Sequence, residues 1–152
     1  MSIEQKAIDM NIAIPTPAKP LAAYVPFVVS GGFAYVSGNL PLEDGKLMMT
    51  GKLGREVSLS QGEACAKRCA INCLGALKAA AGSLDNIEQI VKITVFVNSA
   101  PGFVDQALVA NGASVLLSEL FGEAGKHARS AVGVAELPMN APVEVEVIAK
   151  LK

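Results

Sequence analysis

The alternation of apolar and polar residues predicts several β-strands, and its clearest instance lies near the end of the chain. From 143 to 149, valine or alanine occupies every second position, with Glu144 and Glu146 between them. Successive side chains of a strand point to opposite faces, so this segment has one apolar face and one more polar face. Further β-rich runs predict strands at 25–29, 33–37, 46–50, 90–97 and 129–135.

Other segments carry the signals of helix ends. The capping-box pattern Ser2-Ile3-Glu4-Gln5 predicts a short N-terminal helix within about 2–14, before an extended stretch containing Pro15, Pro17 and Pro20. A second such pattern, Ser60-Gln61-Gly62-Glu63, predicts a long helix that Gly82 ends. A further helix is expected at 105–121, where Gly122 can form the C-cap.

The order of these elements predicts one α+β domain over residues 1–152. Two main helices cannot cover both faces of a mixed sheet of five to six strands, so we expect both on one face. The valines of the last two strands are expected to face the helices, which would place Arg129 among small residues on the uncovered face. Apolar residues form 51% of the chain and charged residues 18%, so we expect oligomerisation to cover that face.

Charge and composition exclude several classes of protein. The net charge is -1, and no basic stripe suited to a phosphate backbone occurs, so nucleic acid is not an expected partner. No run of eighteen apolar residues is present, and the first fifteen residues lack the pattern of a signal peptide. We therefore expect a cytoplasmic protein without a membrane partner.

Three cysteines, Cys65, Cys69 and Cys73, recur every four residues within the long predicted helix. This stripe could be a thiolate metal site or an apolar face packed in the core. No histidine or further cysteine lies nearby in the sequence to complete a tetrahedral site. We therefore favour packing and expect no metal site.

Several motifs together resemble one known family. "ARSAVGVAELP" followed by "VEVEVIA", "IVKITVFV", and Tyr24 fourteen residues before Gly38 of "YVSGNLP" are similar in order and spacing to the RidA/YjgF family, also named the L-PSP endoribonuclease-like family. The resemblance covers roughly 20–150. An N-terminal helix, a longer loop "DGKLMMTGKLGREVS" and His127 in "AGKHARS" depart from the short members and resemble a longer subgroup of about 150 residues.

The resemblance implies a chorismate-mutase-like fold and a homotrimer with a central barrel, with a cleft for a small molecule at each subunit interface. The implied activity is hydrolytic deamination of 2-aminoacrylate or its imine tautomer to a 2-keto acid and ammonia, without a cofactor. A trimeric protein that only binds a small carboxylate metabolite is the alternative. An endoribonuclease is less favoured, because the chain has no basic or aromatic platform for RNA.

The resemblance also assigns roles to residues. A guanidinium holds a carboxylate with two parallel hydrogen bonds, so Arg129 is the expected clamp, although an arginine paired with a surface acid is the alternative. Glu144 is expected to handle water or a proton, with Glu146 as a weaker rival and pairing with a lysine as the alternative. The positions matching substrate-binding residues of the family are Tyr24, Ser37, Gly38, Asn111, Ser130 and Ala131.

Two of these assignments remain open from sequence. Asn111 could instead be a solvated helix residue. His127, the only histidine, is a possible general base or a structural residue.

The distance between the two catalytic candidates poses a further question. If the last two strands form a simple hairpin, Arg129 and Glu144 lie about 20 Å apart, too far to share a small substrate. Either the strands are not neighbours, or the glutamate that works with Arg129 comes from the adjoining subunit. We favour the second interpretation.

Overall fold

The fold is built on a five-stranded sheet with the strand order β1-β2-β7-β5-β6. The structure is a computed structural model and describes residues 1–17 and 23–152. The strands are β1 (Phe27–Ser30), β2 (Phe33–Asn39), β5 (Ile87–Asn98), β6 (Ala128–Val134) and β7 (Val143–Leu151). Neighbouring strands are antiparallel except β5 and β6, which are parallel. The sheet is therefore mixed, as predicted.

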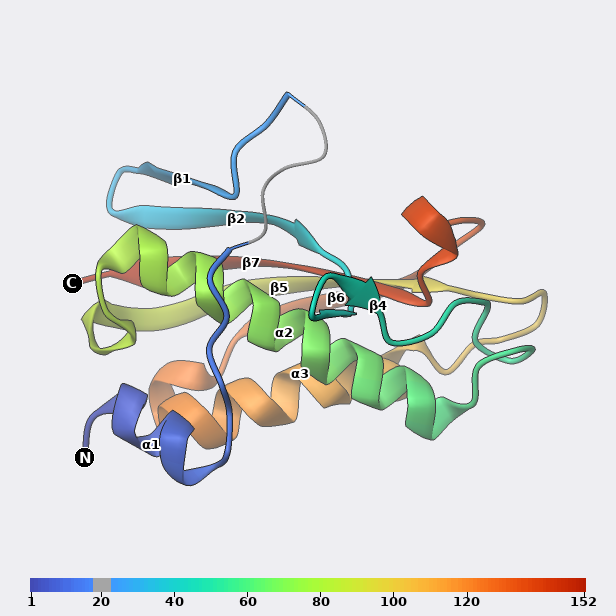
Figure 1. The fold of residues 1–152 in the computed structure, drawn as a ribbon, viewed down its shortest axis with the longest axis horizontal. Coiled ribbons are helices and arrows are strands. Elements are labelled where there is room, and N and C mark those ends of the chain that lie inside the picture. The colour runs from blue at the N-terminus through green and yellow to red at the C-terminus, as the bar shows by residue number, and fades with distance from the viewer. Residues whose placement is uncertain (18–22) are drawn as a thin grey trace.

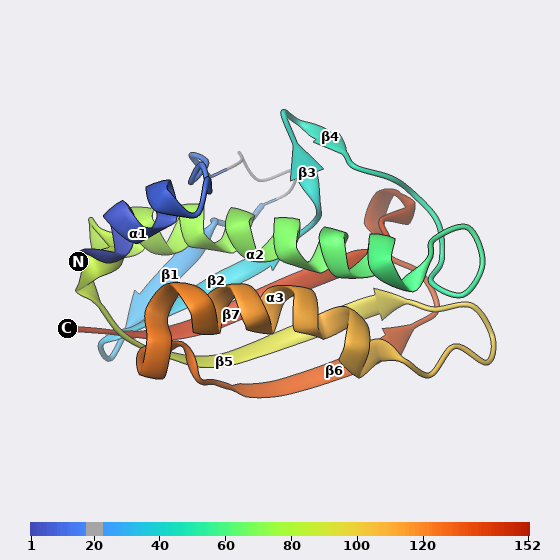
Figure 2. The same cartoon turned by 90° about the horizontal axis from the view of Figure 1, so that it is seen from below.

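The two main helices, α2 (Leu59–Ala81) and α3 (Gln106–Phe121), lie side by side on one face of this sheet (Figures 1 and 2). The apolar face of β7 packs beneath them, with Val143, Val145 and Val147 buried. Within the described residues no helix covers the other face. The predicted layer arrangement is confirmed, and one sheet face remains open in the single chain.

The cap of α2 corrects one detail of the prediction. The helix begins two residues earlier than expected, because Ser58, and not Ser60, is the N-cap. The Ser58 hydroxyl accepts a hydrogen bond from the Gln61 amide (3.2 Å), and the Gln61 side chain accepts one from the Ser58 amide (2.9 Å). This reciprocal pair requires a spacing of three residues, which Ser58 and Gln61 satisfy. Gly82 and Gly122 end α2 and α3 at positive φ, as predicted.

One hairpin forms the β1 edge of the sheet, and a second, separate hairpin follows β2. Gly31 and Gly32 both have positive φ and form the tight turn between β1 and β2, where a hairpin was predicted. The strand expected at 46–50 is shorter. Only Lys46–Leu47 forms a strand, β4, which pairs with β3 (Leu42–Glu43) in a separate two-stranded sheet.

The N-terminal helix α1 (Ile3–Asp9) is present, although shorter than the predicted range. It is attached to the domain through Glu4, whose carboxylate lies 3.0 Å from Lys78 Nζ and accepts a hydrogen bond from the Leu84 amide. Farther along, a Cβ atom at Gly75 would overlap the carbonyl oxygen of Pro15, so the chain crosses α2 in close contact. The predicted extended stretch continues to Pro20, which lies outside the described residues.

The pairing of the last strands contradicts the hairpin considered above. β5 lies between β6 and β7, with Ile93 paired to Arg129 on one side and to Val147 on the other. Paired residues point to the same face, so Arg129 faces the helices and not the open face. The predicted side of Val132 is wrong for the same reason: it pairs with Phe96 and is 43% exposed on the open face. For β7 the predicted faces are confirmed.

The cysteine stripe is buried in the core, as the packing interpretation predicted. The Cys69 thiol donates to the carbonyl oxygen of Val143 (3.6 Å), and the Cys73 thiol to that of Val145 (3.4 Å). Burial raises the pKa of Cys65 to about 11 and that of Cys73 to about 12. Thiols so far from ionisation are poor nucleophiles and poor metal ligands.

None of the helices in the described ranges combines the length and apolar character needed to cross a membrane.

Candidate functional site

Arg129 projects from the edge strand β6 toward α3. Its Nη1 donates hydrogen bonds to Asn111 Oδ1 (2.8 Å) and Ser114 Oγ (3.1 Å), which lie one turn apart on the helix. These two bonds use both hydrogens of Nη1. Within residues 1–17 and 23–152, Nε and Nη2 make no hydrogen bond, and no carboxylate forms an ion pair with Arg129. The alternative of an arginine paired with a surface acid therefore finds no partner in the part of the chain that the structure describes.

The free edge of this guanidinium has the geometry of a carboxylate-binding site. Nε–H and one Nη2–H are parallel donors, and a carboxylate can accept both. Asn111 and Ser114 are neutral acceptors, so they orient the group without neutralising its charge. Arg129 is partly buried, and it can hold an anion there.

Glu144 lies on the open face of the sheet, two strands away. Its carboxyl is half-buried, and burial, together with the charge of Glu146, raises the pKa of Glu144 above its ordinary value. A Cβ atom at Gly38 would overlap Glu144 Oε1, so the carboxylate lies directly against the backbone of Gly38 and a larger residue there would displace it. No lysine pairs with Glu144 among the described residues, although that was the alternative considered from sequence.

Two other predicted residues belong to the same region. Ser37 precedes Gly38 in β2 and donates through its hydroxyl to the carbonyl oxygen of Val25 (2.6 Å). This bond holds the segment before β1, and with it Tyr24, beside β2. The Tyr24 side chain is 50% exposed. Tyr24, Ser37, Gly38 and Glu144 thus form a second group, on the β2–β7 side of the sheet.

The two groups do not meet within one chain. By strand pairing, Arg129 and Glu144 are two strands and three residues apart, or roughly 14 Å between Cα atoms. Their side chains also point to opposite faces of the sheet. The neighbours of Arg129 divide in the same way, because Ser130 pairs with Thr94 on the open face and Ala131 with Val95 on the helix side.

His127 lies just before β6 and contacts the Arg129 group. Its Nε2 is 2.9 Å from Ser114 Oγ, and its Nδ1 is 2.6 Å from the carbonyl oxygen of Gly125. Ser114 was not predicted as a site residue. It follows Asn111 by three positions and therefore lies on the same helix face, which is the signal that could have identified it.

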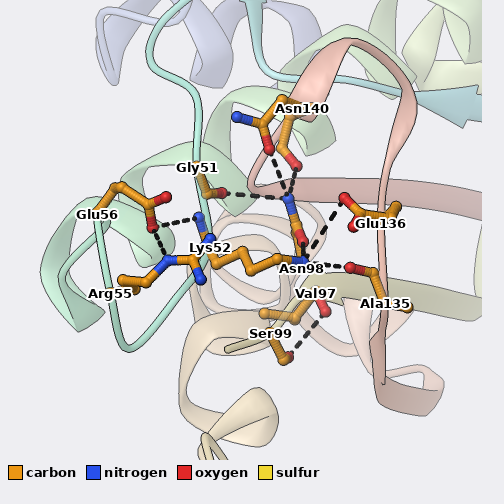
Figure 3. Close-up of polar contacts among 11 residues, drawn as sticks. Gly51, Lys52, Arg55, Glu56, Val97, Asn98, Ser99, Ala135, Glu136 and Asn140 are labelled. Carbon is orange, nitrogen blue, oxygen red and sulfur yellow. Dashed lines mark hydrogen bonds and ion pairs between the residues drawn. The ribbon is translucent and has the colours of Figure 1, made fainter. Parts of the chain in front are cut away.

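A second polar cluster, also unpredicted, lies at the end of β5 (Figure 3). Asn98 is fully buried and donates to the carbonyl oxygens of Gly51 (3.3 Å) and Ala141 (3.1 Å). Its Oδ1 accepts a hydrogen bond from Lys52 Nζ (2.7 Å), which also donates to the Ala135 carbonyl and lies 3.7 Å from Glu136. Each of these polar side chains has a hydrogen-bond or ion-pair partner within the cluster. The cluster therefore connects three loops and does not resemble a vacant binding site.

The described ranges also contain a cavity away from these residues. A cavity of about 350 Å³ lies between the segment Pro15–Pro17, the β3–β4 hairpin and Asn72 of α2, and none of the predicted site residues lines it. Those ranges also contain no cluster of three or more His, Cys, Asp or Glu side chains suited to a metal.

Comparison with known proteins identifies relatives over nearly the whole chain. Residues 4–151 match the family model described as "YjgF/chorismate mutase-like, putative endoribonuclease". The sequence is 46% identical over 143 residues to Protein TCP17 of Trypanosoma cruzi, covering 93% of this chain and 89% of that protein.

Two crystal structures are also similar. A protein of unknown function from Agrobacterium tumefaciens has a TM-score of 0.90 and 44% identity, covering 98% of this chain and 91% of that one. A protein from Shewanella oneidensis, named as a putative endoribonuclease, has a TM-score of 0.96 and 31% identity, covering 99% of this chain and 100% of that one. These likenesses include the N-terminal helix as well as the sheet.

Proposed function

Since the chain belongs to the YjgF/chorismate mutase-like family, we propose that it hydrolyses reactive enamine and imine acids related to 2-aminoacrylate and 2-iminopropanoate. The products are a 2-keto acid and ammonia. The observation that carries this proposal is Arg129, whose Nε–Nη2 edge has no partner among the described residues and whose position is set by two neutral side chains. An α-imino acid presents a carboxylate directly beside its C=N carbon, so a carboxylate clamp fixes the reacting atom as well.

Glu144 is suited to the proton transfers of the reaction. Water attacks the imine carbon, and Glu144 accepts a proton from it and returns one to the nitrogen. In the resulting carbinolamine, Glu144 passes the hydroxyl proton to the amino group, the C–N bond then breaks, and ammonia leaves while the carbonyl of the keto acid forms. A carboxyl with a raised pKa is a better proton donor near neutrality than an ordinary one.

The site requires two subunits. Arg129 and Glu144 face opposite sides of one sheet, and the open face carries exposed apolar side chains such as Val28 (53%) and Tyr35 (46%). We propose a homotrimer in which the open faces pack together. The Glu144 group of one subunit then approaches the Arg129 group of the next, as the family resemblance implies.

Two other functions make different predictions. A metabolite-binding protein would use the same Arg129 clamp without turnover. An endoribonuclease activity is named in the description of the matched family model and in the name of the Shewanella relative, but the net charge of -1 disfavours strong binding of RNA.

The test measures keto-acid and ammonia release from 2-iminopropanoate generated in place by an amino-acid oxidase. The wild type should release keto acid faster than the buffer reaction. Arg129→Ala and Arg129→Lys should each lose most of the activity, because one ammonium cannot replace two parallel donors.

Arg68→Lys is the matched control, since Arg68 forms a surface ion pair with Glu43 (3.3 Å) and should tolerate the change. Carboxylate binding without turnover would identify a binding protein instead. Full activity in a folded Arg129→Lys protein would contradict the role of Arg129.

A further inference from the structure

Arg129 is connected to a short chain of hydrogen bonds that the sequence did not reveal. Its Nη1 contacts Ser114 Oγ at 3.1 Å, Ser114 Oγ contacts His127 Nε2 at 2.9 Å, and His127 Nδ1 contacts the Gly125 carbonyl oxygen at 2.6 Å. The four groups come from α3, the turn after it and the start of β6. The chain therefore links the helix layer to the edge strand at the position of the guanidinium.

The chemistry of the partners determines which atom donates and which accepts in each of these hydrogen bonds. A carbonyl oxygen only accepts, so His127 Nδ1 carries the hydrogen in the contact with Gly125. In the neutral ring, Nε2 is then an acceptor, and the Ser114 hydroxyl donates to it. A lone pair of the Ser114 oxygen remains for Arg129 Nη1–H, which has no alternative but to donate. With the neutral ring, every donor in the series therefore has an acceptor.

The turn at Gly125, where this series of hydrogen bonds ends, is tightly packed. Gly125 is buried, and a Cβ atom there would overlap the carbonyl oxygen of Leu117, so the turn packs directly against α3. His127 is thereby held at both ring nitrogens. This arrangement leaves neither nitrogen free to take a proton from water, which argues against the general-base role considered from sequence.

We infer that Ser114 and His127 are positioning residues, which fix the rotation of the Arg129 guanidinium so that its Nε–Nη2 edge faces the substrate carboxylate. This inference rests on the proposed function. Asn111 alone holds one hydrogen of Nη1 and leaves the group free to turn about that bond. A second acceptor on the same nitrogen determines the plane of the guanidinium, and His127 determines where the Ser114 lone pairs point.

The test compares two probes of the same size. Pyruvate carries the carboxylate, and pyruvamide replaces it with a neutral amide; binding of each is measured by ligand-observed NMR. Ser114→Ala should weaken pyruvate binding by roughly ten-fold, the effect of losing one hydrogen bond to a charged group. His127→Phe should also weaken it, because the Ser114 lone pairs are then no longer directed at Arg129. Binding of pyruvamide should change little. A purely structural defect would instead weaken the binding of pyruvate and of pyruvamide to the same extent.

Matched variants separate the possibilities. Ser114→Thr keeps a hydroxyl and should retain pyruvate binding, while Ser118→Ala, one turn along α3, should behave as the wild type. In the Arg129→Ala background, adding Ser114→Ala should cause no further loss, because Ser114 acts through the missing arginine.

The two levels of the proposal fail differently. Pyruvate binding that is absent in the wild type, or unchanged in Arg129→Ala, would contradict the proposed function. Pyruvate binding that Arg129→Ala abolishes, but that Ser114→Ala and His127→Phe leave unchanged, would overturn the positioning role alone.

Discussion

Arg129 is a partly buried cation. Its guanidinium is hydrogen-bonded by the neutral side chains of Asn111 and Ser114, and no carboxylate among the described residues balances its charge. Burying a charge costs free energy unless an opposite charge or sufficient hydrogen bonds replace the lost water. Two acceptors on one nitrogen satisfy two of its five N–H groups. The remaining donors are therefore available to an anionic ligand, whose binding would complete the solvation of the guanidinium.

Glu144 allows a prediction about stability and pH. Burial and the neighbouring Glu146 raise the pKa of Glu144 in the folded protein above the ordinary value of 4.5. The folded state then binds a proton more strongly than the unfolded state, so stability is lost as pH rises from 4.5 through the folded pKa. Glu144→Gln removes this loss. The variant should unfold at a higher temperature than the wild type at about pH 7, with the difference vanishing at about pH 4.

Thermal unfolding monitored across this pH range checks the prediction. Glu119→Gln, an exposed position of α3, is the control and should show no such gain. A Glu144→Gln protein less stable than the wild type at neutral pH would show that the folded state favours the ionised carboxylate. If Glu144 is catalytic, the stabilised variant should also have lost its turnover, which is the usual relation between strain and function at a site.

Sequence identified Arg129, its partner Asn111 and, as a possible site residue, His127, but it missed Ser114, which joins Arg129 to His127. Arg129 is easy to notice in the sequence, because it is the only charged residue in a strand of small and apolar residues. Ser114 is not, because a serine on a partly exposed helix face has no distinguishing period. The face of Arg129 was assigned wrongly because alternation separates two sides of a strand without saying which side meets the helices. Only the parallel pairing of Arg129 with Ile93 decides that.

At the scale of elements, the cysteine stripe of α2 gives a second prediction. Cys69 is fully buried and contributes packing and a weak hydrogen bond to the Val143 carbonyl. Cys69→Ala should reduce the free energy of unfolding by about 1 kcal/mol, because it removes one buried sulfur atom. Chemical denaturation measures the change. Stoichiometric zinc in the native protein that disappears in this variant would show that the stripe is a metal site instead.

The loop cluster around Asn98 predicts a larger loss of stability. Asn98→Ala would leave the carbonyl oxygens of Gly51 and Ala141 without their side-chain donor, and Lys52 without one acceptor. Such losses of buried partners should lower the free energy of unfolding by roughly 2–4 kcal/mol. Asn86→Ala is the matched control, because within the described residues the Asn86 side chain makes a single hydrogen bond, at an exposed position (2.9 Å), and its loss should cost less than about 1 kcal/mol. Equal losses for the two variants would contradict a fastening role for Asn98.

The elements differ in how well their sequence reveals them. Helix ends depend on local chemistry, so glycine C-caps such as Gly82 and the Gly31-Gly32 turn could be read directly. Strand order depends on contacts between distant segments. Nothing local shows that β5 lies between β6 and β7, and the assumption of a hairpin was the natural error for two consecutive strands. Asn98 was missed for a similar reason, since its partners come from loops far away in the chain.

At the scale of the whole molecule, the helices cover one face of the sheet and leave the other face, which carries several exposed apolar side chains, open in the single chain. Tyr35 in β2 and Val132 in the edge strand β6 are exposed apolar side chains of this face. A soluble protein rarely leaves a large contiguous apolar surface without a partner. Oligomerisation through this face would bury it. It would also allow the groups around Arg129 and Glu144 to meet between subunits, although one chain holds them apart.

The most direct test of this central claim is a subunit-mixing experiment. Arg129→Ala and Glu144→Ala proteins, each inactive, are unfolded, mixed in equal amounts and refolded, and mixed trimers are verified by native mass spectrometry. In a cyclic trimer, every mixed assembly holds one interface at which both wild-type groups face each other, so random mixing should restore roughly a quarter of the wild-type sites. Mixing Arg129→Ala with Arg129→Lys is the control and should restore nothing. We predict keto-acid release from 2-iminopropanoate near that fraction of the wild-type rate, whereas no recovery in verified mixed trimers would contradict a site shared between subunits.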